Sequence, residues 1–399
     1  MKIGVIVDNQ LNKDIRVLRE INILREKGHE IFVLCFAFDN NSSKTIPGIT
    51  TVRIKIKRWV KNILYFFLNT IPVYEWLWSF RTSRFIIKYN IEVVHVHDLY
   101  MSRAVHKGIA RSGEKTPMIL DLHENYPYTA MTYNWTKGFI RGLISRPEQW
   151  ELKEKEYLGY AWKIIVLSNE YRDLLLTRYP NLSSKDFTIV PNVPELYPMV
   201  KKNNISIKNL FTQSYPIIFY FGVIAERRGV FDALRVFTEL VKEDCKVNFL
   251  FIGPIDKKDK TQFLKMINGT LVVNNIHYIP WIDFSELGAY LEISDICIAP
   301  FHKNAQHESG IANKVFDYML GKKPIIASDC LPQQILIEKY NCGLIYKNDL
   351  ELKAAIINLL TNKELRDEMG QNGYKVVTKE YNTNMIKDGL FSLYNSVKS

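Results

Sequence analysis

The chain has 399 residues, of which 47% are hydrophobic. It is therefore long enough for two domains of about 200 residues each and too apolar to be globally disordered. Its net charge of +11 favours an anionic partner such as a nucleotide, a nucleic acid or a membrane. The five cysteines are odd in number and lie mostly in apolar runs, which indicates a reducing cytosol and no disulfide framework.

The first half of the chain alternates short apolar runs with amphipathic segments. The run KIGVIV at 2–7 is followed at once by Asp8, so it is too short for a signal peptide and predicts a buried strand. A helix over about 13–27, closed by Gly28, comes next. Further strands are predicted at 30–36, 92–97, 117–122 and 163–168, and the stretch FTIVPN at 187–192 closes this half. Runs that are apolar on both sides predict a parallel sheet covered by helices.

The stretch 53–88 combines basic and aromatic residues. It holds eight basic residues and one acid, Glu75, which gives a net charge of +7. A membrane-spanning helix over 62–80 is disfavoured by Asn69, Pro72 and Glu75, since a central acid alone costs about 2.5–3.5 kcal/mol. The favoured prediction is two helices broken at Pro72, each with an apolar side and basic flanks.

Helices of that kind lie flat in a membrane interface, with tryptophans at headgroup depth and cations towards anionic lipid. The residues predicted for this acceptor or membrane side are Trp59 and the cations Lys55, Lys57, Arg58 and Lys61. The alternative is that the aromatic side chains pack on the first sheet and the cations are solvated.

The second half repeats the alternation after a predicted linker at 193–215. Strands are predicted at 216–222, 246–253, 294–300 and 323–328. These patterns predict two doubly wound domains that face each other across a cleft, with ligands at the C-terminal strand ends. The predicted division is 1–195 together with a C-terminal helix within 382–399, and 196–381. The last helix, over about 384–398, is expected to pack back on the first domain.

Three histidines follow apolar strand runs in the first half. His95 and His97 share one face of a strand, and His123 follows the next strand along the chain. A histidine in such a place is often only structural. Together the three could instead hold a metal ion, which would indicate a metal-dependent hydrolase, although the H-x-H pair lies on an internal strand and not on the first.

Two segments of the second half have the features of an anion site. Gly222 ends a strand, and Arg227, Arg228 and Gly229 precede the next helix, where free backbone N–H groups and guanidiniums suit a phosphate. The alternative is a solvated pair of Arg227 with Glu226.

The second segment is HESGIANKVFDYMLG, at 307–321, which has a helical spacing of apolar residues. Its predicted first turn contains Ser309, Gly310, Asn313 and Lys314, and Ser309, Asn313 and Asp317 are expected on one polar face. A lysine at a helix start is unfavourable by about 0.3–1 kcal/mol unless an anion binds there. Asp317 could accept hydrogen bonds from a ribose. The alternative is an ion pair of Lys314 with Asp317 on a wet face.

In order and spacing, several motifs resemble the retaining glycosyltransferases of family 4, which have the two-Rossmann GT-B fold. They are D-x-R-V-x-R-E at 14–20, H-x-H-D at 95–98, D-L-H-E-N-Y at 121–126, I-V-P-N at 189–192, G-x5-R-G at 222–229 and SGIANKVFDYMLGKKP at 309–324. The resemblance covers nearly the whole chain. It implies that the second domain holds a nucleotide-sugar donor and the first domain an acceptor.

The resemblance also implies roles for individual residues. His123 matches the catalytic histidine beside the reacting sugar, and Asp317 matches an acid that contacts the ribose. The acid that contacts the donor sugar is matched by Ser309, with Glu308 one residue earlier. The implied donor-binding residues are Gly222, Arg227, Arg228, Glu308, Ser309, Gly310, Asn313, Lys314 and Asp317.

The function implied is retaining sugar transfer to a saccharide or lipid-linked saccharide in cell-surface polysaccharide biosynthesis. A nucleotide-sugar is the expected co-substrate, with no obligatory metal or cofactor and no nucleic-acid partner. The expected location is the cytoplasm, peripheral on the inner face of the cytoplasmic membrane and attracted by its anionic surface. The alternatives are the metal-dependent hydrolase on His95, His97 and His123, and an inactive relative that only binds sugar nucleotide.

Overall fold

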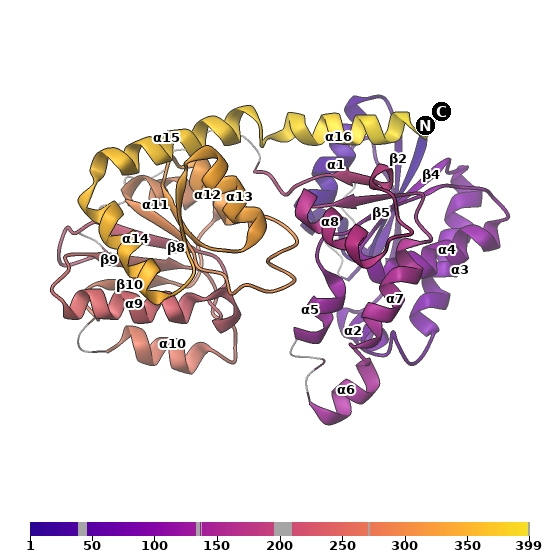
Figure 1. The fold of residues 1–399 in the computed structure, drawn as a ribbon. Helices are drawn as coiled ribbons and strands as arrows, with labels where there is room; N and C mark the ends of the chain where they lie inside the picture. Colours follow the sequence, from indigo (N-terminus) through magenta and orange to yellow (C-terminus); the bar gives the residue numbers. More distant parts are fainter. Residues whose placement is uncertain (39–45, 133–135, 137, 195–209, 270–271, 398–399) are drawn as a thin grey trace. The chain divides into compact units, whose positions relative to one another are not determined.

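The computed structural model describes residues 1–38, 46–132, 136, 138–194, 210–269 and 272–397. The chain forms two compact units. The first unit is Met1–Pro191 with Asn384–Ser399, and the second unit is Asn192–Thr383 (Figure 1). The chain therefore passes from one unit to the other twice. Most of the linker predicted at 193–215 lies outside the described residues, which lack 195–209.

The first unit is built on a seven-stranded sheet in which every neighbouring pair is parallel. Its order is β3-β2-β1-β4-β5-β6-β7, so the order reverses between β1 and β4. The strands are β1 (Lys2–Val7), β2 (Glu30–Ala37), β3 (Thr50–Lys55), β4 (Val93–His97), β5 (Met118–Asp121), β6 (Lys163–Val166) and β7 (Phe187–Ile189). Ligands of such sheets bind beyond the C-terminal strand ends near this reversal. β3 is a strand that the sequence did not predict.

Helices cover the first sheet, and large side chains such as Trp78 and Tyr74 are fully buried beneath them. Pro72 is the N-cap of α3, so the predicted break there is confirmed. The helices are η1 (Leu11–Lys13), α1 (Ile15–Glu26), α2 (Arg58–Phe66), α3 (Val73–Tyr89), η3 (Leu99–Met101), α4 (Ser102–Ser112), α5 (Tyr126–Thr132), α6 (Phe139–Ser145), α7 (Gln149–Leu158), α8 (Asn169–Arg178), η4 (Ser184–Asp186) and α16 (Thr383–Asn395).

The C-terminal helix α16 packs on the first unit, as the sequence predicted. Its apolar side buries Ile386 and Leu390 completely. Two contacts with α1 and its C-cap fix its position: Lys387 pairs with Glu26 at 2.6 Å, and Lys27 donates to the Asn395 side chain at 2.8 Å. The helix thus completes a unit whose other residues precede it by nearly half the chain.

The second unit has a six-stranded parallel sheet of order β10-β9-β8-β11-β12-β13. Its strands are β8 (Ile217–Phe221), β9 (Asn248–Ile252), β10 (Ile276–Ile279), β11 (Ile296–Ala299), β12 (Ile325–Ser328) and β13 (Gly343–Tyr346). Its helices are η6 (Glu226–Arg228), α9 (Val230–Lys242), α10 (Lys260–Ile267), η7 (Phe284–Glu286), α11 (Leu287–Ile293), α12 (Asn313–Leu320), α13 (Leu331–Tyr340), α14 (Asp349–Thr361) and α15 (Lys363–Lys379). β10 and β13 are strands that the sequence did not predict. The order again reverses next to the first strand, between β8 and β11.

Helix α12 corrects the prediction for the segment at 307–321. It begins at Asn313, so Ser309 and Gly310 precede the helix and do not belong to its first turn. The Ser309 hydroxyl donates to the Ala305 carbonyl at 2.6 Å, which favours a turn at 305–308 over helix. Every residue from Lys314 to Leu320 is buried. The expected polar face with Ser309, Asn313 and Asp317 is therefore wrong.

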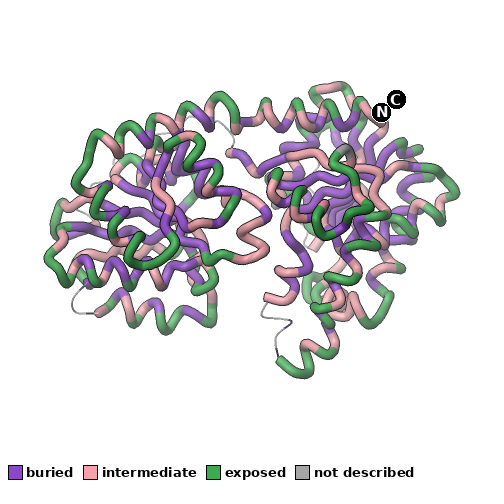
Figure 2. The backbone as a smooth tube through the Cα atoms, in the orientation of Figure 1, coloured by how far each residue is buried: buried purple, intermediate pink, exposed green. Residues whose placement is uncertain are grey.

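In both units the buried residues concentrate in the strands and on the inner sides of the helices (Figure 2). Among the described residues, no helix combines the length and the apolar character needed to cross a membrane.

Candidate functional site

A charged cluster lies under the C-terminal strand ends of the first unit, with Asp121 at its centre. Asp121 ends β5 and is fully buried. Arg16 of α1 donates to both of its carboxylate oxygens, at 2.9 Å and 3.2 Å, and also pairs with Glu20 at 3.1 Å. Burial alone would raise the pKa of the Asp121 carboxyl, but Arg16 and His123 hold that pKa well below its usual range. Asp121 is therefore a carboxylate compensated by two cations.

His123 lies beside this carboxylate. Its Nε2 is 3.2 Å from Asp121 Oδ2 and 2.9 Å from His97 Nδ1. Burial alone would lower the pKa of the imidazole, but Asp121 raises it to about 9. His123 is thus an imidazolium at neutral pH, and its Nε2–H donates into the cluster. Its Nδ1 lies 3.9 Å from Asp98, outside the hydrogen bonds of the cluster, and the side chain is 21% exposed.

His95 is different in character. Burial and the neighbouring His97 hold the pKa of the His95 imidazole well below its usual range, so it is neutral. Its Nδ1 is 2.9 Å from the Tyr394 hydroxyl of α16. The His95 and His97 rings are stacked at 4.6 Å, which confirms that they share one face of β4.

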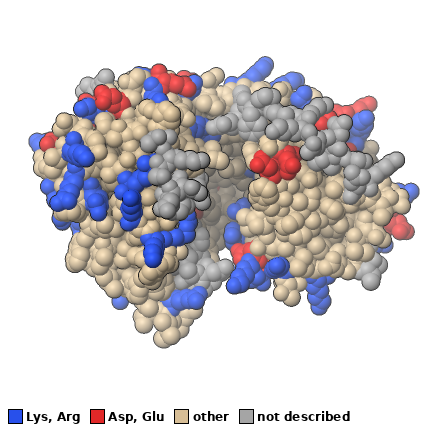
Figure 3. Space-filling model, turned by 180° about the vertical axis from the view of Figure 1, so that it is seen from behind, with Lys and Arg blue, Asp and Glu red and all other residues tan. Residues whose placement is uncertain are grey.

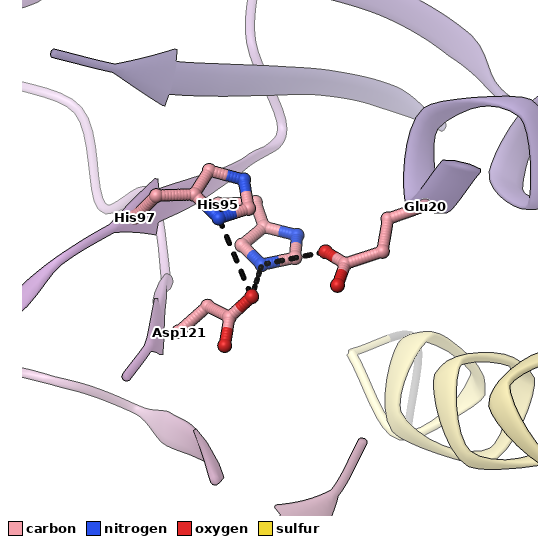
Figure 4. A group of neighbouring side chains, drawn as sticks. All are labelled: Glu20, His95, His97 and Asp121. Carbon is pink, nitrogen blue, oxygen red and sulfur yellow. Dashed lines mark ion pairs between the residues drawn. The ribbon is translucent and has the colours of Figure 1, made fainter. Parts of the chain in front are cut away.

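Glu20, His95, His97 and Asp121 form a candidate metal-binding set, with ligand atoms within 4.8 Å of one another (Figure 4). This set is not the predicted one, because two carboxylates take the place of His123. Both carboxylates are already paired with Arg16. A metal ion would have to displace that guanidinium from a fully buried place, so the residues fit a divalent cation poorly.

A cavity of about 220 Å³ opens beside the end of β1 in the first unit. Its walls include Asp8 and Asn9 after β1, Asp98 after β4, and Arg58 and Asn62 of α2. Carboxylates, amides and a guanidinium around a small cavity suit the hydroxyl groups of a saccharide.

Asp8 is the most deeply buried acid of this cavity. It pairs with Lys61 of α2 at 3.2 Å. Burial raises the pKa of the Asp8 carboxyl, and Lys61 opposes that rise. Lys61 is therefore turned towards the cavity and neutralised by Asp8, which contradicts its predicted place on a lipid-facing surface.

The other predicted membrane-side residues lie at the surface. Lys55, Lys57 and Arg58 are exposed, and Trp59 is 61% exposed. Arg58 also lies over the Phe38 ring at 4.5 Å, at the mouth of the cavity. Seen from behind, several basic side chains gather on the unit that holds the N-terminus (Figure 3).

In the second unit, a second buried cluster lies at the C-terminal end of β8. Gly222 follows that strand with a φ of +124°, and a Cβ there would lie 3.1 Å from Lys314 Nζ. Gly229 is the N-cap of α9, and a Cβ there would collide with the Pro300 carbonyl. The two predicted glycines thus allow the chain to pass close to Lys314 and to the end of β11.

Among the residues that the structure describes, Lys314 and Arg228 form no ion pair of the kind that Arg16 forms with Asp121. Lys314 Nζ lies 3.6 Å from the centre of the Tyr220 ring and, like Arg228 Nε, has no hydrogen-bond partner among the described residues. Burial and Arg228 hold the pKa of the Lys314 ammonium well below its usual range. Burial also lowers the pKa of Arg228.

Asp317 is the acid nearest to Lys314 in the sequence, one helical turn away. Burial raises the pKa of its carboxyl to about 7, and Lys314 lowers that pKa only in part. The predicted alternative of a Lys314–Asp317 pair on a wet face is wrong, since both residues are buried. Within the described residues the cluster is deficient in negative charge.

The remaining predicted donor residues are placed as follows. Arg227 is half-exposed and pairs with Asp256 at 3.6 Å instead of Glu226. Glu308 accepts a hydrogen bond from the Leu331 N–H at the start of α13, at 2.9 Å. Ser309 is buried, whereas Asn313 is exposed.

Several residues of these clusters were not singled out from the sequence. Arg16 and Glu20 lay in a matched motif, yet their partner Asp121 is 105 residues from Arg16. Phe301, whose ring centre is 5.1 Å from Lys314 Nζ, directly follows the strand predicted at 294–300 and was not considered. The one available signal was position, because all of them follow or face the C-terminal end of a strand.

Two family models match the chain. The model described as glycosyltransferase family 4 matches residues 15–193, and the model described as glycosyl transferases group 1 matches residues 201–376.

Two curated relatives are similar over part of their length. An uncharacterised glycosyltransferase of Methanocaldococcus jannaschii is 24% identical over 55% of this chain and 54% of its own. A capsular polysaccharide biosynthesis glycosyltransferase of Staphylococcus aureus is 24% identical over 45% of this chain and 46% of its own. The chain thus spans about half the length of the curated relatives it matches.

Solved structures are similar over nearly the whole chain. Sucrose-phosphate synthase from Thermosynechococcus elongatus has a TM-score of 0.75 at 17% identity, covering 100% of this chain and 99% of its own. An Anabaena protein in complex with UDP has a TM-score of 0.70 at 12% identity, covering 99% and 100%. These likenesses confirm the predicted fold class of two Rossmann-like units.

Proposed function

The chain belongs to the family 4 glycosyltransferases, whose fold is GT-B, and we propose that it transfers a sugar from a nucleotide-sugar donor to a saccharide or lipid-linked saccharide acceptor. The observation that carries this proposal is the buried ammonium of Lys314 beside the partly buried Arg228 at the end of β8, where Lys314 Nζ and Arg228 Nε have no hydrogen-bond partner among the described residues. A diphosphate would supply the missing negative charge. The relative named for capsular polysaccharide biosynthesis supports a role in making cell-surface polysaccharide.

The second unit is proposed to bind the donor. Lys314 and Arg228 would bind the diphosphate, with Gly222 letting it approach the backbone, and Asp317 would accept a hydrogen bond from the ribose. Arg227, Glu308, Ser309, Gly310 and Asn313 remain proposed donor-binding residues. The solved neighbour in complex with UDP is consistent with a uridine nucleotide.

The first unit is proposed to bind the acceptor in the cavity beside β1, where Asp8, Asn9 and Asn62 would bind its hydroxyl groups. His123 would orient the transferred sugar through its Nδ1–H. Because its pKa is raised to about 9, His123 is a hydrogen-bond donor at neutral pH and not a general base. Asp121 acts as a positioning residue that keeps it protonated.

We propose that transfer retains the anomeric configuration. The bond between the anomeric carbon and the diphosphate oxygen breaks, and the acceptor oxygen forms a bond to the same face of that carbon. The acceptor hydroxyl proton passes to the departing diphosphate. Lys314 and Arg228 would stabilise the charge that develops on the leaving group, and a donor of this kind commonly contributes about 10²–10³ in rate. No obligatory metal is invoked in this scheme.

The location proposed is the anionic inner surface of the cytoplasmic membrane, where a lipid-linked acceptor would be found. This part of the proposal is supported by exposed Trp59 and the exposed cations Lys55 and Lys57 next to the acceptor cavity. Lys61 is no longer part of the proposed membrane side, since it pairs with Asp8.

The test is a thermal-shift series with nucleoside diphosphates, followed by donor hydrolysis and transfer assays on the variant Lys314→Met. Stabilisation by a nucleoside diphosphate, and turnover lost in Lys314→Met, would support the proposal. Binding without turnover in the unmodified protein would favour the inactive relative. Stoichiometric zinc or manganese bound at His95 and His97 would favour the metal-dependent hydrolase.

A further inference from the structure

Helix α6 is an unusual element of the first unit, because its apolar side chains point outwards. Phe139 is 89% exposed, Ile140 71% and Leu143 64%. Ser145 is the single buried residue of this seven-residue helix. Burying such side chains is normally what stabilises a short helix, and here they remain in solvent. A surface built in this way fits a partner that covers it.

The exposed side of α2 continues the apolar surface. Trp59 is 61% exposed and Ile63 49%, and they lie four residues apart on one side of the helix. The turn after α2 is bound to the end of α6, because the Asn69 amide donates to the carbonyls of Ser145 at 2.7 Å and Arg146 at 3.2 Å. We call this combined surface the α2–α6 face; its apolar residues are Trp59, Ile63, Phe139, Ile140 and Leu143.

The two chain segments that form the α2–α6 face contain cations and no acid. Neither the segment 56–71 nor the segment 136–147 contains an aspartate or a glutamate. Exposed cations flank both helices: Lys57 and Arg58 at the start of α2, and Arg141 and Arg146 in and after α6. Apolar side chains surrounded by cations are complementary to a surface that has a negative outer layer over an apolar interior. An anionic lipid bilayer has that structure.

We propose that the α2–α6 face inserts into the boundary between headgroups and acyl chains of an anionic bilayer, with α6 as the inserted anchor. This inference rests on the proposed membrane location. It adds that the anchor is α6, which lies outside the basic stretch 53–88. Helix α2 then has two roles. Trp59 and Ile63 face the lipid, while Arg58, Lys61 and Asn62 line the acceptor cavity. Insertion would bring the mouth of that cavity to the membrane surface.

The experiment is flotation of the full-length protein with vesicles of phosphatidylglycerol and phosphatidylcholine, or of phosphatidylcholine alone. The variant Phe139→Ser/Ile140→Ser/Leu143→Ser should reduce the partition coefficient onto anionic vesicles by about tenfold or more. Leu350→Ser/Ile357→Ser is the matched control, because it removes exposed apolar residues of α14 in the second unit and should change nothing. Replacing Lys57, Arg141 and Arg146 by glutamine should weaken binding and flatten its dependence on salt.

Three outcomes would overturn the proposal. They are unchanged flotation of the α6 variant, equal flotation with neutral vesicles, and a lipid-free dimer that the α6 substitutions dissociate, which would show that a second copy covers the face. Donor hydrolysis without vesicles is measured in parallel and should be unaffected in the α6 variant. A protein that floats as expected but never turns over a nucleotide-sugar would contradict the proposed function and leave the membrane face intact.

Discussion

Both units have buried charged side chains at the C-terminal ends of their strands, but the charges are balanced within the protein in the first unit and not in the second. In the first unit Asp121 is surrounded by Arg16 and His123, and each charge has an opposite charge within hydrogen-bond distance. In the second unit Lys314 is buried beside the partly buried Arg228, and among the described residues the acid that opposes Lys314 is Asp317, whose pKa burial raises to about 7. The charges of the first cluster are balanced by other residues of the protein, whereas the positive charge of the second cluster is not balanced until an anion binds.

The difference in charge balance suggests that the first cluster serves to hold its residues in place and the second to bind a ligand. A compensated network holds its members in place, because removing one partner leaves another charge buried and unpaired. An uncompensated cluster costs stability in the free protein and returns that free energy when an anion binds. We therefore expect substitutions in the first cluster to affect folding, and substitutions in the second to affect ligand binding.

The largest expected effect is on folding. Asp121→Ala leaves Arg16 and His123 without their carboxylate and should lower the free energy of unfolding by about 3–5 kcal/mol. The measurement is denaturation by urea, with Lys314→Met as the comparison. If Asp121→Ala is as stable as the unmodified protein, the first cluster is not the compensated network described here.

The second prediction concerns the uncompensated cluster. Lys314→Met should reduce turnover of the donor by about 10²–10³ while leaving the stability of the free protein equal or slightly higher, because a buried ammonium is removed. Steady-state kinetics and urea denaturation on the same sample give both values. A large loss of stability would show that Lys314 has a partner that the free protein needs.

A third prediction is selective stabilisation by a nucleoside diphosphate. At 100 times its dissociation constant the ligand should raise the stability of the unit that binds it by about 2.7 kcal/mol. Arg228→Ala and Asp317→Ala should weaken this effect, with native far-ultraviolet dichroism. Hydrogen exchange shows which unit is protected, and protection confined to the first unit would reverse the proposed assignment of the two units.

The fourth prediction separates the clusters by pH. The pKa of His123 is raised from 6.5 to about 9 in the folded state, so its contribution to stability is complete below about pH 6.5 and is lost as the pH rises through about 9. At about 1.4 kcal/mol for each pKa unit, the loss is roughly 2 kcal/mol after allowance for partial exposure.

The check is the difference in unfolding free energy between the unmodified protein and His123→Gln, measured from pH 6 to pH 10. For Asp317, whose raised pKa is about 7, the same reasoning places the window between about pH 4 and pH 7. Asp317→Asn should remove the pH dependence of the unfolding free energy between about pH 4 and pH 7 and leave the dependence that His123 causes at higher pH. If His123→Gln and Asp317→Asn change the unfolding free energy over the same pH range, the titrations of the two clusters are coupled.

The smallest expected effect is at the edge of the first cluster. Tyr394→Phe removes the hydroxyl that contacts His95 Nδ1 and should cost about 0.5–1.5 kcal/mol. Turnover should change little, because the neutral His95 does not contact the proposed substrates. A loss of turnover comparable to that of Lys314→Met would mean that α16 positions the catalytic residues.

The order of strands and helices follows from sequence pattern wherever an apolar run is long. β1, β4 and β8 were predicted within one or two residues of their bounds. β10 was missed because His277 interrupts its apolar run, and β13 because it begins with Gly343 and has only three apolar residues after it. Such short strands are defined by the neighbour they pair with, which local pattern does not reveal.

In the candidate sites too, the sequence did not reveal contacts between residues that are distant in the chain. Arg228 was singled out by its place after a strand and Lys314 by its place at a helix start, whereas the role of His123 came from the resemblance to a known family. The sequence could not show that Lys61 pairs with Asp8, because the two residues are distant in the chain and only the fold brings α2 to the end of β1. It could not reveal the exposed side of α6 either, since an apolar run such as that of Phe139–Ser145 predicts burial.

The double crossing of the chain between the units has a consequence for biosynthesis. Tyr394 and the rest of α16 leave the ribosome only after the whole second unit, roughly 190 residues later than Pro191. At about 5–20 residues per second this interval lasts roughly 10–40 s. During that time the second unit can fold as one continuous piece, whereas the first unit waits with the surface that receives α16 uncovered. The nascent first unit is therefore the part of the chain most in need of a chaperone.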